Sequence, residues 1–506
     1  MIAVFLNKQD FEYDVHSLVK AFYPGEDVRI VYEEAQPQET SELNINLSLR
    51  GRHDGQKDEI KMYVRILYEK EKIQISILDR DGTELVKDQT EIDYYAQRKE
   101  TKNHLKQLLY RMLSTRKGET LPWGTLTGIR PTKIPMALLE QGKKNSEIAQ
   151  YMKDTYYTSN EKTALSIAIA NKERHILKNL NCQNGYSLYV GIPFCPSICL
   201  YCSFSSSPIS VWKDRVDAYL EALIKEMEYG AKEYAERKLD TVYIGGGTPT
   251  TLNPDQMELL LSKLEEYFDM EHILEYTVEA GRPDSITREK LQVLKNHHVS
   301  RISINPQTMN QKTLDLIGRR HTVEETKAAF FMARDLGFDN INMDLIVGLP
   351  GEGKKEVERS MREVMQLDPE SVTVHSLALK RAARLTMFKE EYQEMTFTNN
   401  MEIMDMTAQY ALHSGLYPYY LYRQKNMAGN FENVGYAKEG KEGIYNILIM
   451  EEIQSILALG AGASTKMVLA SDRIERIENV KDIKNYIERI DEMIERKRQG
   501  FIKYGK

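Results

Sequence analysis

The pattern of hydrophobic and polar positions changes near residue 183. From there on, short β-branched runs alternate with amphipathic segments of about a dozen residues or more, which is typical of parallel strands joined by helical crossovers. Strands are predicted at 186–192, 241–244, 275–279, 300–305, 340–347 and 371–376. Helices are predicted near 212–236, 254–268, 286–297, 323–337 and 354–366. This order fits an incomplete β/α barrel or a doubly wound sheet, and both place their chemistry at the carboxyl ends of the strands.

The first 118 residues predict a separate small α/β domain, whose role the sequence does not indicate. Strands are expected near 28–32, 44–49, 61–68 and 72–79, with a turn at Asp81-Gly82 and a helix near 95–115. Nothing in this segment resembles catalytic machinery. Residues 119–182 begin as a turn-rich connector and then show helical patterns near 132–140, 145–153 and 159–178. We therefore expect them to form a helical bridge.

The last segment, 386–506, is less regular and predicts an α+β region. It contains a Met-rich helix near 398–413, a tyrosine cluster at 417–422, the loop Gly460–Ser464 and a charged helix near 480–498. The chain is thus expected to have four segments: 1–118, 119–182, 183–385 and 386–506. We expect the last of these to lie on the substrate side of the core.

Composition and charge narrow the functional classes. The 506 residues are 42% hydrophobic, which is enough for more than one core. The net charge of -7 comes from 68 basic and 75 acidic residues that are mixed along the chain, without the basic stripe that nucleic-acid binding needs. The apolar opening ends after six residues, and no later run approaches the ~20 apolar residues of a membrane span. We expect a cytoplasmic protein without nucleic-acid partners.

Three of the four cysteines follow the first predicted core strand, in the spacing Cys195-x3-Cys199-x2-Cys202. Three thiolates can hold three irons of a four-iron cluster and leave the fourth iron open to a small molecule. A zinc site completed by a histidine, or a chance spacing at a buried strand end, is the alternative. The next histidine, however, is His272. Cys182 stands alone and is interpreted as a passive thiol.

A glycine-rich turn, Gly245-Gly-Gly-Thr-Pro-Thr250, follows the second core strand. Glycines allow a backbone to approach a ligand closely. By itself, such a turn can also be a plain tight turn or a phosphate cradle. Its position one strand after the cysteine loop makes the pair more specific than either motif alone.

The two motifs together resemble the radical S-adenosylmethionine (SAM) superfamily. Tyr189-Val-Gly-Ile-Pro-Phe-Cys195 and the Gly-Gly-Gly-Thr-Pro-Thr turn are similar to its oxygen-independent coproporphyrinogen III oxidase branch, which includes related heme chaperones. The resemblance covers about 183–385 and continues more loosely to about 465, and the N-terminal extension is similar to that of the HemZ-like coproporphyrinogen dehydrogenase subgroup. It implies an incomplete (β/α)6 radical SAM barrel over 183–385, with a [4Fe-4S] cluster and SAM as cofactors.

The resemblance also implies roles for individual residues. Cys195, Cys199 and Cys202 match the cluster ligands. The matching SAM contacts are Tyr189, Tyr201, Gly246, Gly247, Thr248, Glu279, Gln307, Arg319 and Asp344. In this set, Tyr201 would flank the adenine, the glycine turn would receive the methionyl amine, and Arg319 would pair with the methionyl carboxylate. No protein group is assigned as catalytic, because the radical is generated on the cofactor.

Several of these positions also have ordinary structural explanations when each is considered alone. Glu279 can cap a helix, Asp344 can be a satisfied acid at a strand end, and Arg319 can lie on a solvated face. The functional interpretation depends on their joint placement, since each lies at or just past a predicted strand end.

The implied activity is oxidative decarboxylation of the propionates of coproporphyrinogen III to the vinyl groups of protoporphyrinogen IX, an oxygen-independent step of heme biosynthesis. An electron donor such as flavodoxin or ferredoxin would serve it. The sequence departs from the family at three places: Gly191 replaces a histidine, Phe204 replaces a further cysteine, and a segment beginning at Tyr445 replaces a His-Asn plus Tyr-Trp element. These departures leave cofactor binding intact and concern the substrate.

Two alternatives therefore stay open. The chain can be a heme chaperone that delivers heme to client proteins, with His321, His375 or a clustered tyrosine as heme ligand. It can also direct radical chemistry at another tetrapyrrole.

Overall fold

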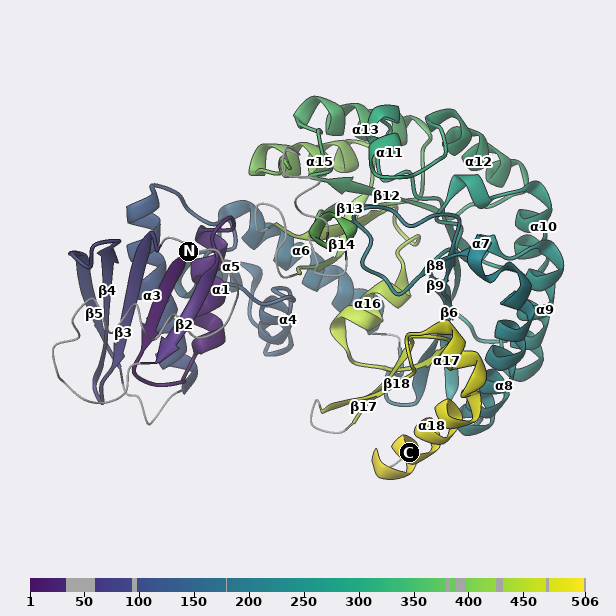
Figure 1. Cartoon of the computed structure of the whole chain (residues 1–506), viewed down its shortest axis with the longest axis horizontal. Helices are drawn as coiled ribbons and strands as arrows, with labels where there is room; N and C mark the ends of the chain where they lie inside the picture. Colours follow the sequence, from purple (N-terminus) through teal and green to yellow (C-terminus); the bar gives the residue numbers. More distant parts are fainter. Residues whose placement is uncertain are drawn as a thin grey trace. The chain divides into compact units, whose positions relative to one another are not determined.

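The computed structural model describes residues 1–32, 60–92, 98–178, 180–378, 383–387, 397–424, 431–469 and 473–504. The chain divides into two compact units, Met1–Ile167 and Ala168–Lys506 (Figure 1). The strand predicted at 44–49 lies outside the described residues. The finer division into four segments stays a prediction.

The first unit contains a five-stranded sheet in the order β2-β1-β3-β4-β5. Its strands are β1 (Ile2–Leu6), β2 (Val28–Tyr32), β3 (Met62–Tyr68), β4 (Lys72–Asp79) and β5 (Glu84–Glu91), and its helices are α1 (Glu12–Phe22), α3 (Arg98–Lys117), α4 (Lys133–Glu140) and α5 (Asn145–Tyr156). The turn predicted at Asp81-Gly82 is confirmed, because Gly82 has a φ of 84° and donates its amide to the Asp79 carbonyl. The sequence missed β1, although all five of its residues are buried.

Helix α6 (Asn160–Leu177) leads from the first unit into the second. The second unit has an eleven-stranded sheet in the order β14-β15-β13-β12-β11-β10-β9-β6-β16-β17-β18. Six consecutive members of this order are parallel: β6 (Gly185–Ile192), β9 (Lys238–Gly246), β10 (Glu275–Glu279), β11 (Arg301–Ser303), β12 (Ile341–Val347) and β13 (Ser371–Ser376). All six predicted core strands are thus confirmed. The order is linear, so the barrel is incomplete.

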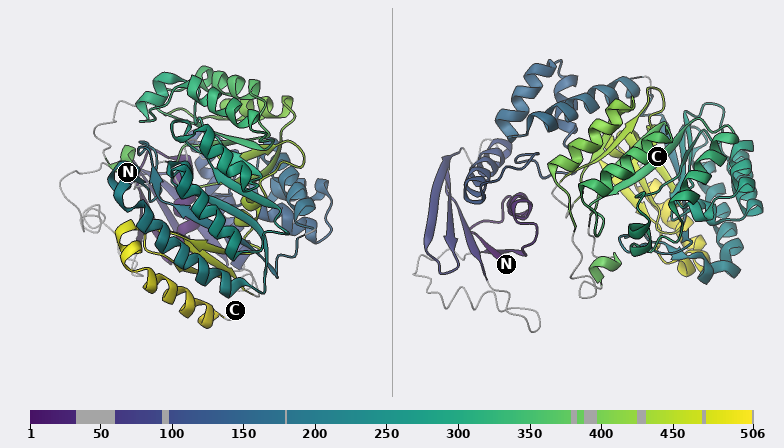
Figure 2. Two further views of the ribbon diagram at one scale, coloured as in Figure 1. Left: turned by 90° about the vertical axis from the view of Figure 1, so that its right-hand side faces the viewer. Right: turned by 90° about the horizontal axis from the view of Figure 1, so that it is seen from above.

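Helices cover the outer face of the curved sheet, as Figures 1 and 2 show. They are α8 (Val216–Tyr234), α9 (Pro254–Tyr267), α10 (Arg288–Asn296), α12 (Val323–Asp335) and α13 (Lys354–Gln366), and the shorter helices are α7 (Ile209–Trp212), α11 (Gln311–Leu316) and α14 (Arg384–Met387). Capping boxes start two of the crossovers: Asn253 exchanges bonds with Gln256 before α9, and Thr322 with Glu325 before α12. Local sequence therefore sets these helix starts.

The C-terminal region extends the core sheet at both edges. On one side, β16 (Ser455–Leu459) lies parallel to β6 and is followed by β17 (Ser464–Val468) and β18 (Ile474–Glu478); on the other, β15 (Asn433–Ala437) and β14 (Tyr417–Tyr422) run antiparallel beyond β13. The accompanying helices are α15 (Met401–His413), α16 (Ile444–Glu451), α17 (Ile483–Glu488) and α18 (Ile490–Tyr504). The sequence analysis predicted α15 but not β16, a seventh parallel strand. Of the helices in the described ranges, none is both long and apolar enough to span a bilayer.

Candidate functional site

The cysteine loop begins where β6 ends. Phe194–Cys195 forms the short strand β7, which pairs in parallel with β8 (Ser207–Pro208). The Cys202 amide donates to the Cys199 carbonyl at 3.1 Å, which folds the loop back between the second and third cysteines. All three thiols are free, and Cys199 is buried. The motif thus places its thiols on one compact loop at the carboxyl end of a parallel strand.

The surroundings of the loop favour the protonated form of the Cys195 and Cys202 thiols. Burial raises the pKa of Cys195, and burial together with the neighbouring thiols raises the pKa of Cys202 to about 11. Iron binds thiolates, so assembly of a cluster here must release protons. Within the described ranges, no three His, Cys, Asp or Glu side chains converge as ligands of a single metal ion do. A four-iron cluster has no such requirement, because each thiolate binds a different iron.

The glycine turn packs directly against the cysteine loop. The amides of Gly247 and Thr248 donate to the carbonyls of Ile192 and Phe194, both at 2.7 Å. A Cβ at Gly247 would lie 2.4 Å from the Phe194 carbonyl oxygen, so only glycine fits there. The Thr248 hydroxyl lies 3.6 Å from the Cys195 sulfur. A ligand amine needs acceptors, so the use of these amides in backbone bonds does not compete with the predicted contact to the methionyl amine.

Acidic and aromatic side chains meet at the carboxyl ends of the next strands. Tyr189 and Tyr243 stack with ring centroids 6.3 Å apart, and the Tyr243 hydroxyl donates to Glu279. Burial and the nearby Asp344 carboxylate raise the pKa of Glu279 to about 7, although the Tyr243 bond opposes this. Glu279 is therefore partly protonated near neutral pH.

Asp344 on β12 has the opposite electrostatics. Burial disfavours its ionised form, but the nearby His375 and a 2.7 Å bond from the Asn342 amide outweigh burial and lower the pKa of Asp344. The His375 Nε2 atom lies 3.7 Å from the carboxylate. Glu279 and Asp344 lie close enough to interact electrostatically, so the structure brings these two predicted contacts together.

Arg319 is buried beside the cysteine loop. Its guanidinium donates to the Tyr201 hydroxyl at 3.2 Å and to the carbonyls of Gly281 and Asn305 at 2.8 and 2.6 Å. Its Nε atom has no hydrogen-bond partner. A buried guanidinium with an unused donor suits an anionic group such as a carboxylate. The structure therefore brings Arg319 and Tyr201 together, and Arg319 is not on a solvated face.

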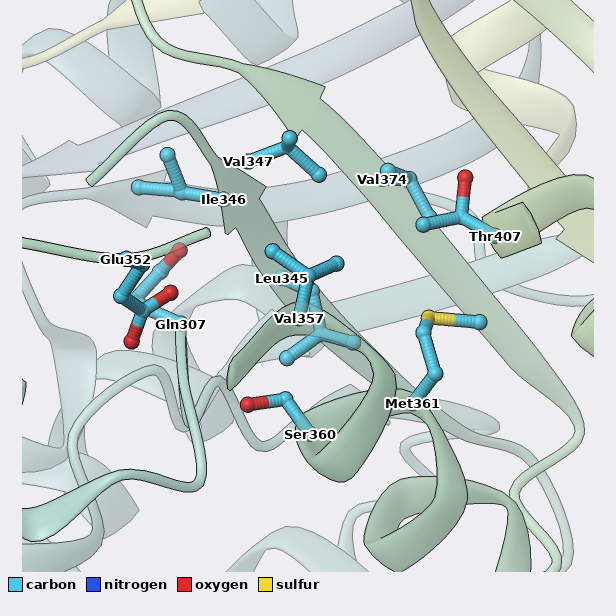
Figure 3. Close-up of a pocket in the computed structure, with 10 residues that line it drawn as sticks. All are labelled: Gln307, Leu345, Ile346, Val347, Glu352, Val357, Ser360, Met361, Val374 and Thr407. Carbon is cyan, nitrogen blue, oxygen red and sulfur yellow. The ribbon is translucent and has the colours of Figure 1, made fainter. Parts of the chain in front are cut away.

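The side chain of Gln307 points into a separate small pocket beside α13. Its backbone is held beside β12 in a left-handed conformation with a φ of 67°, and its amide donates to the Asp344 carbonyl. Its side chain, however, lines a small pocket together with Leu345, Glu352 and side chains of α13, as Figure 3 shows. The Gln307 Oε1 atom is buried there without a hydrogen-bond partner. Its predicted contact with SAM stays a prediction.

The sequence analysis missed two polar residues of the site, Arg282 and Asn305, and it named His375 only as an alternative heme ligand. Arg282 contacts the cysteine loop, and Asn305 accepts the Arg319 bond through its carbonyl. Each follows or ends a predicted core strand, as the predicted contacts do. Placement at strand ends was therefore a usable signal, but the family motif had drawn attention to other positions.

Comparison with known proteins agrees with this arrangement. Residues 189–364 match the model of the radical SAM superfamily. The oxygen-independent coproporphyrinogen-III oxidase-like protein HemZ of Bacillus subtilis (strain 168) is 42% identical over 404 residues, which cover 79% of this chain and 81% of the relative. This chain belongs to the radical SAM superfamily, in its branch of HemN- and HemZ-like proteins.

Other members of the branch are also similar. The heme chaperone HemW of Bacillus subtilis (strain 168) is 32% identical over 60% of this chain and 76% of its own length. The structure of coproporphyrinogen III oxidase HemN from Escherichia coli matches with a TM-score of 0.51 and 24% identity, over 62% of this chain and 70% of HemN. At that identity the match concerns the fold, and it confirms the predicted barrel.

As a radical SAM protein, this chain has two cofactors, a [4Fe-4S] cluster and SAM. The residues present fit both groups. Three free thiols on one loop suit a cluster with an open iron, and the unused Nε of buried Arg319 suits a carboxylate.

Proposed function

We propose that this radical SAM protein catalyses the oxidative decarboxylation of coproporphyrinogen III propionates to the vinyl groups of protoporphyrinogen IX. In this proposal Cys195, Cys199 and Cys202 hold the cluster, with its open iron available to SAM. The observation that carries the proposal is the contact of the cysteine loop with the glycine turn, at the carboxyl ends of β6 and β9. The 42% identity with the HemZ protein supports the substrate class.

When bound and reduced by one electron, the cluster supplies reductive cleavage of SAM, and the resulting radical chemistry removes a hydrogen atom from the substrate. The protein's own residues orient the cofactor. We assign the methionyl carboxylate to Arg319 and the methionyl amine to the turn Gly246–Thr248. In the same proposal Tyr201 contacts the adenine. Further contacts with SAM are made by Tyr189, Glu279, Gln307 and Asp344. A flavodoxin or ferredoxin is the proposed electron donor.

The C-terminal segment 386–506 supplies the substrate side in this proposal. Helix α16 brings the Tyr445 ring to 4.5 Å from Tyr243, in a stacked arrangement inside the barrel. The amide of Tyr445 donates to Glu275 at 3.2 Å, and the preceding amide of Ile444 donates to the same carboxylate. A side chain of this segment therefore reaches the interior beside Glu279. That placement supports a substrate that enters between the barrel and the C-terminal region.

The test is anaerobic reconstitution of the cluster, followed by incubation with dithionite, SAM and coproporphyrinogen III. The products to measure are 5′-deoxyadenosine and decarboxylated porphyrin. We expect both from the wild-type protein and neither from Cys199→Ala, while Cys182→Ala serves as the matched cysteine control and keeps the activity. Deoxyadenosine without decarboxylation would show that the substrate is wrong. If Cys199→Ala still forms both products, the cluster assignment is wrong.

A heme chaperone is the second candidate, and one observation favours it. Phe204, which stands two residues after Cys202, is 72% exposed, so an aromatic side chain is open to solvent beside the cysteine loop. The similarity to the HemW chaperone points the same way. Stable heme binding and transfer to a client protein, without decarboxylated product in the assay above, would select this function.

A further inference from the structure

Arg282 lies in the loop after β10 and contacts the cysteine loop at Ser197 and Cys199. It is 3% exposed. Its Nη1 atom lies 3.6 Å from the Cys199 sulfur, within hydrogen-bond distance for sulfur, and donates to the Ser197 carbonyl at 3.1 Å. One guanidinium edge therefore faces a proposed cluster ligand and the backbone beside it.

The rest of the guanidinium is held by a carboxylate. Arg282 donates from Nε and Nη2 to the two oxygens of Asp284 at 3.0 and 2.8 Å, a bidentate pair. The Nη2 atom also donates to the Ser197 hydroxyl, which in turn donates to the Gly318 carbonyl at 3.1 Å. Because every edge of the planar group is engaged, Arg282 has little freedom to turn away from the sulfur.

We propose that Arg282 is a positioning residue that sets the reduction potential of the cluster through its hydrogen bond to Cys199. The inference rests on the proposed cluster at Cys195, Cys199 and Cys202. Reduction adds one electron from an external donor to the [4Fe-4S]2+ cluster and gives [4Fe-4S]+. The added negative charge spreads onto the ligand sulfurs, so a donor and a positive charge at Cys199 favour the reduced form.

Asp284 acts in the opposite sense. Its carboxylate is the nearest counter-ion of Arg282, and its negative charge disfavours the reduced cluster. Replacing Arg282 therefore shifts the midpoint potential to more negative values, whereas Asp284→Asn shifts it to more positive values. A purely structural role for the pair predicts no such opposition, because either change would loosen the same loop.

The experiment uses the full-length reconstituted protein without SAM, poised in an EPR-monitored redox titration of the [4Fe-4S]+ signal. The variants are Arg282→Met, Arg282→Lys and Asp284→Asn. Arg282→Lys keeps the positive charge but loses the bidentate geometry of the guanidinium. It still allows the inference to be tested if Arg282→Met does not hold its cluster. The matched control is Arg334→Lys on α12, an arginine that pairs with Glu370 and donates to two backbone carbonyls elsewhere in the fold.

We expect a more negative midpoint in Arg282→Met, a smaller shift of the same sign in Arg282→Lys, and a more positive midpoint in Asp284→Asn. Unchanged midpoints in variants with normal iron and sulfide content would overturn the inference, and so would shifts of one sign in all three. Iron and sulfide content of the wild type separates this failure from that of the proposed function. A wild-type chain that holds no cluster would refute the cluster assignment and this inference with it.

Discussion

At the scale of single residues, close backbone approach and buried charge shape the site. Gly247 is the clearest example of close backbone approach. Its neighbours are carbonyl oxygens of the strand end that carries Cys195, and backbone cannot move aside as a flexible side chain can. The glycine is thus a requirement of packing between two loops.

We expect Gly247→Ala to destabilise the protein by about 1–3 kcal/mol, the usual range for overpacking against a structure that cannot yield. The new methyl group would meet the carbonyls of Phe194 and Ile192 at 2.4 and 2.9 Å. Chemical unfolding measures the stability, and anaerobic titration with SAM measures the loss of binding. Gly353→Ala is the control, because its Cβ would meet only the Glu356 side chain at an ordinary 3.5 Å. Equal losses in the two variants would contradict the packing argument.

Glu279 makes the stability depend on pH. Its pKa is about 7 in the folded protein and near 4.5 when unfolded, so between these values the folded state holds a proton that the unfolded state has released. The contribution of protonated Glu279 to the free energy of unfolding is fully present below pH 4.5 and is lost as the pH rises through about 7. The difference between about 7 and 4.5 corresponds to about 3 kcal/mol.

Glu279→Gln cannot ionise and should remove this contribution to the pH dependence. Urea unfolding at a series of pH values between 5 and 8 measures it, and we expect the variant to gain stability relative to wild type as the pH rises. Glu289→Gln, on the exposed first turn of α10, serves as the control. A difference between wild type and Glu279→Gln that stays constant across this range would show that Glu279 has an ordinary pKa.

At the scale of elements, a buried polar network ties the C-terminal helices to the strand that leads to the cysteines. Lys497 on α18 and Glu226 on α8 are both fully buried, with Nζ 2.9 Å from Oε1. Glu226 also accepts from Tyr486 on α17 and from the Gly460 amide. Tyr219, also on α8, donates to the Gly191 carbonyl at 2.6 Å. Elements far apart in sequence thus meet at the end of β6.

Lys497→Met should cost about 3–5 kcal/mol of stability, because it leaves the Glu226 charge buried without its cation. Denaturant unfolding checks this. Lys503→Met on the same helix is the control, since its ammonium lies over the Tyr504 ring at the end of the chain. The double variant Lys497→Met, Glu226→Met should recover part of the loss. A loss as small as that of the control would mean that the pair contributes little.

At the scale of the whole molecule, the two units have separate cores. The core of the first unit is formed by residues from Ile2 to Leu121, which all precede the radical SAM region. Separate cores predict separate unfolding transitions, so a single melting temperature does not describe this chain.

We therefore expect Leu109→Ala, at a fully buried position of α3, to destabilise the first unit by about 2–5 kcal/mol. In the full-length protein, iron content and the EPR signal of the reduced cluster should stay at wild-type values. Calorimetry and limited proteolysis report which unit has weakened. Loss of the cluster in Leu109→Ala would show that the two units fold as one.

The sequence by itself determined the features that depend on neighbouring residues. The periods of its apolar positions were enough for six core strands and their crossover helices. The spacing of Cys195, Cys199 and Cys202 indicated an open iron-sulfur site, and the resemblance of this motif and the glycine turn to the radical SAM superfamily implied SAM. Such signals are local, because a strand or helix pattern and a short motif lie within about twenty residues. Arg319 and Glu279 were indicated by the resemblance to the family, and their placement at or just past predicted strand ends supported that interpretation.

Only the tertiary structure decided which distant segments meet. The five-residue run Ser455–Leu459 carries no mark that it pairs with β6, because its partner is chosen by the fit of side chains across the whole sheet. The side chain of Gln307 turns into a pocket beside α13, and Arg282 faces the Cys199 sulfur. Sequence spacing gives no direction for a side chain in a loop. Packing against the remaining chain supplies it.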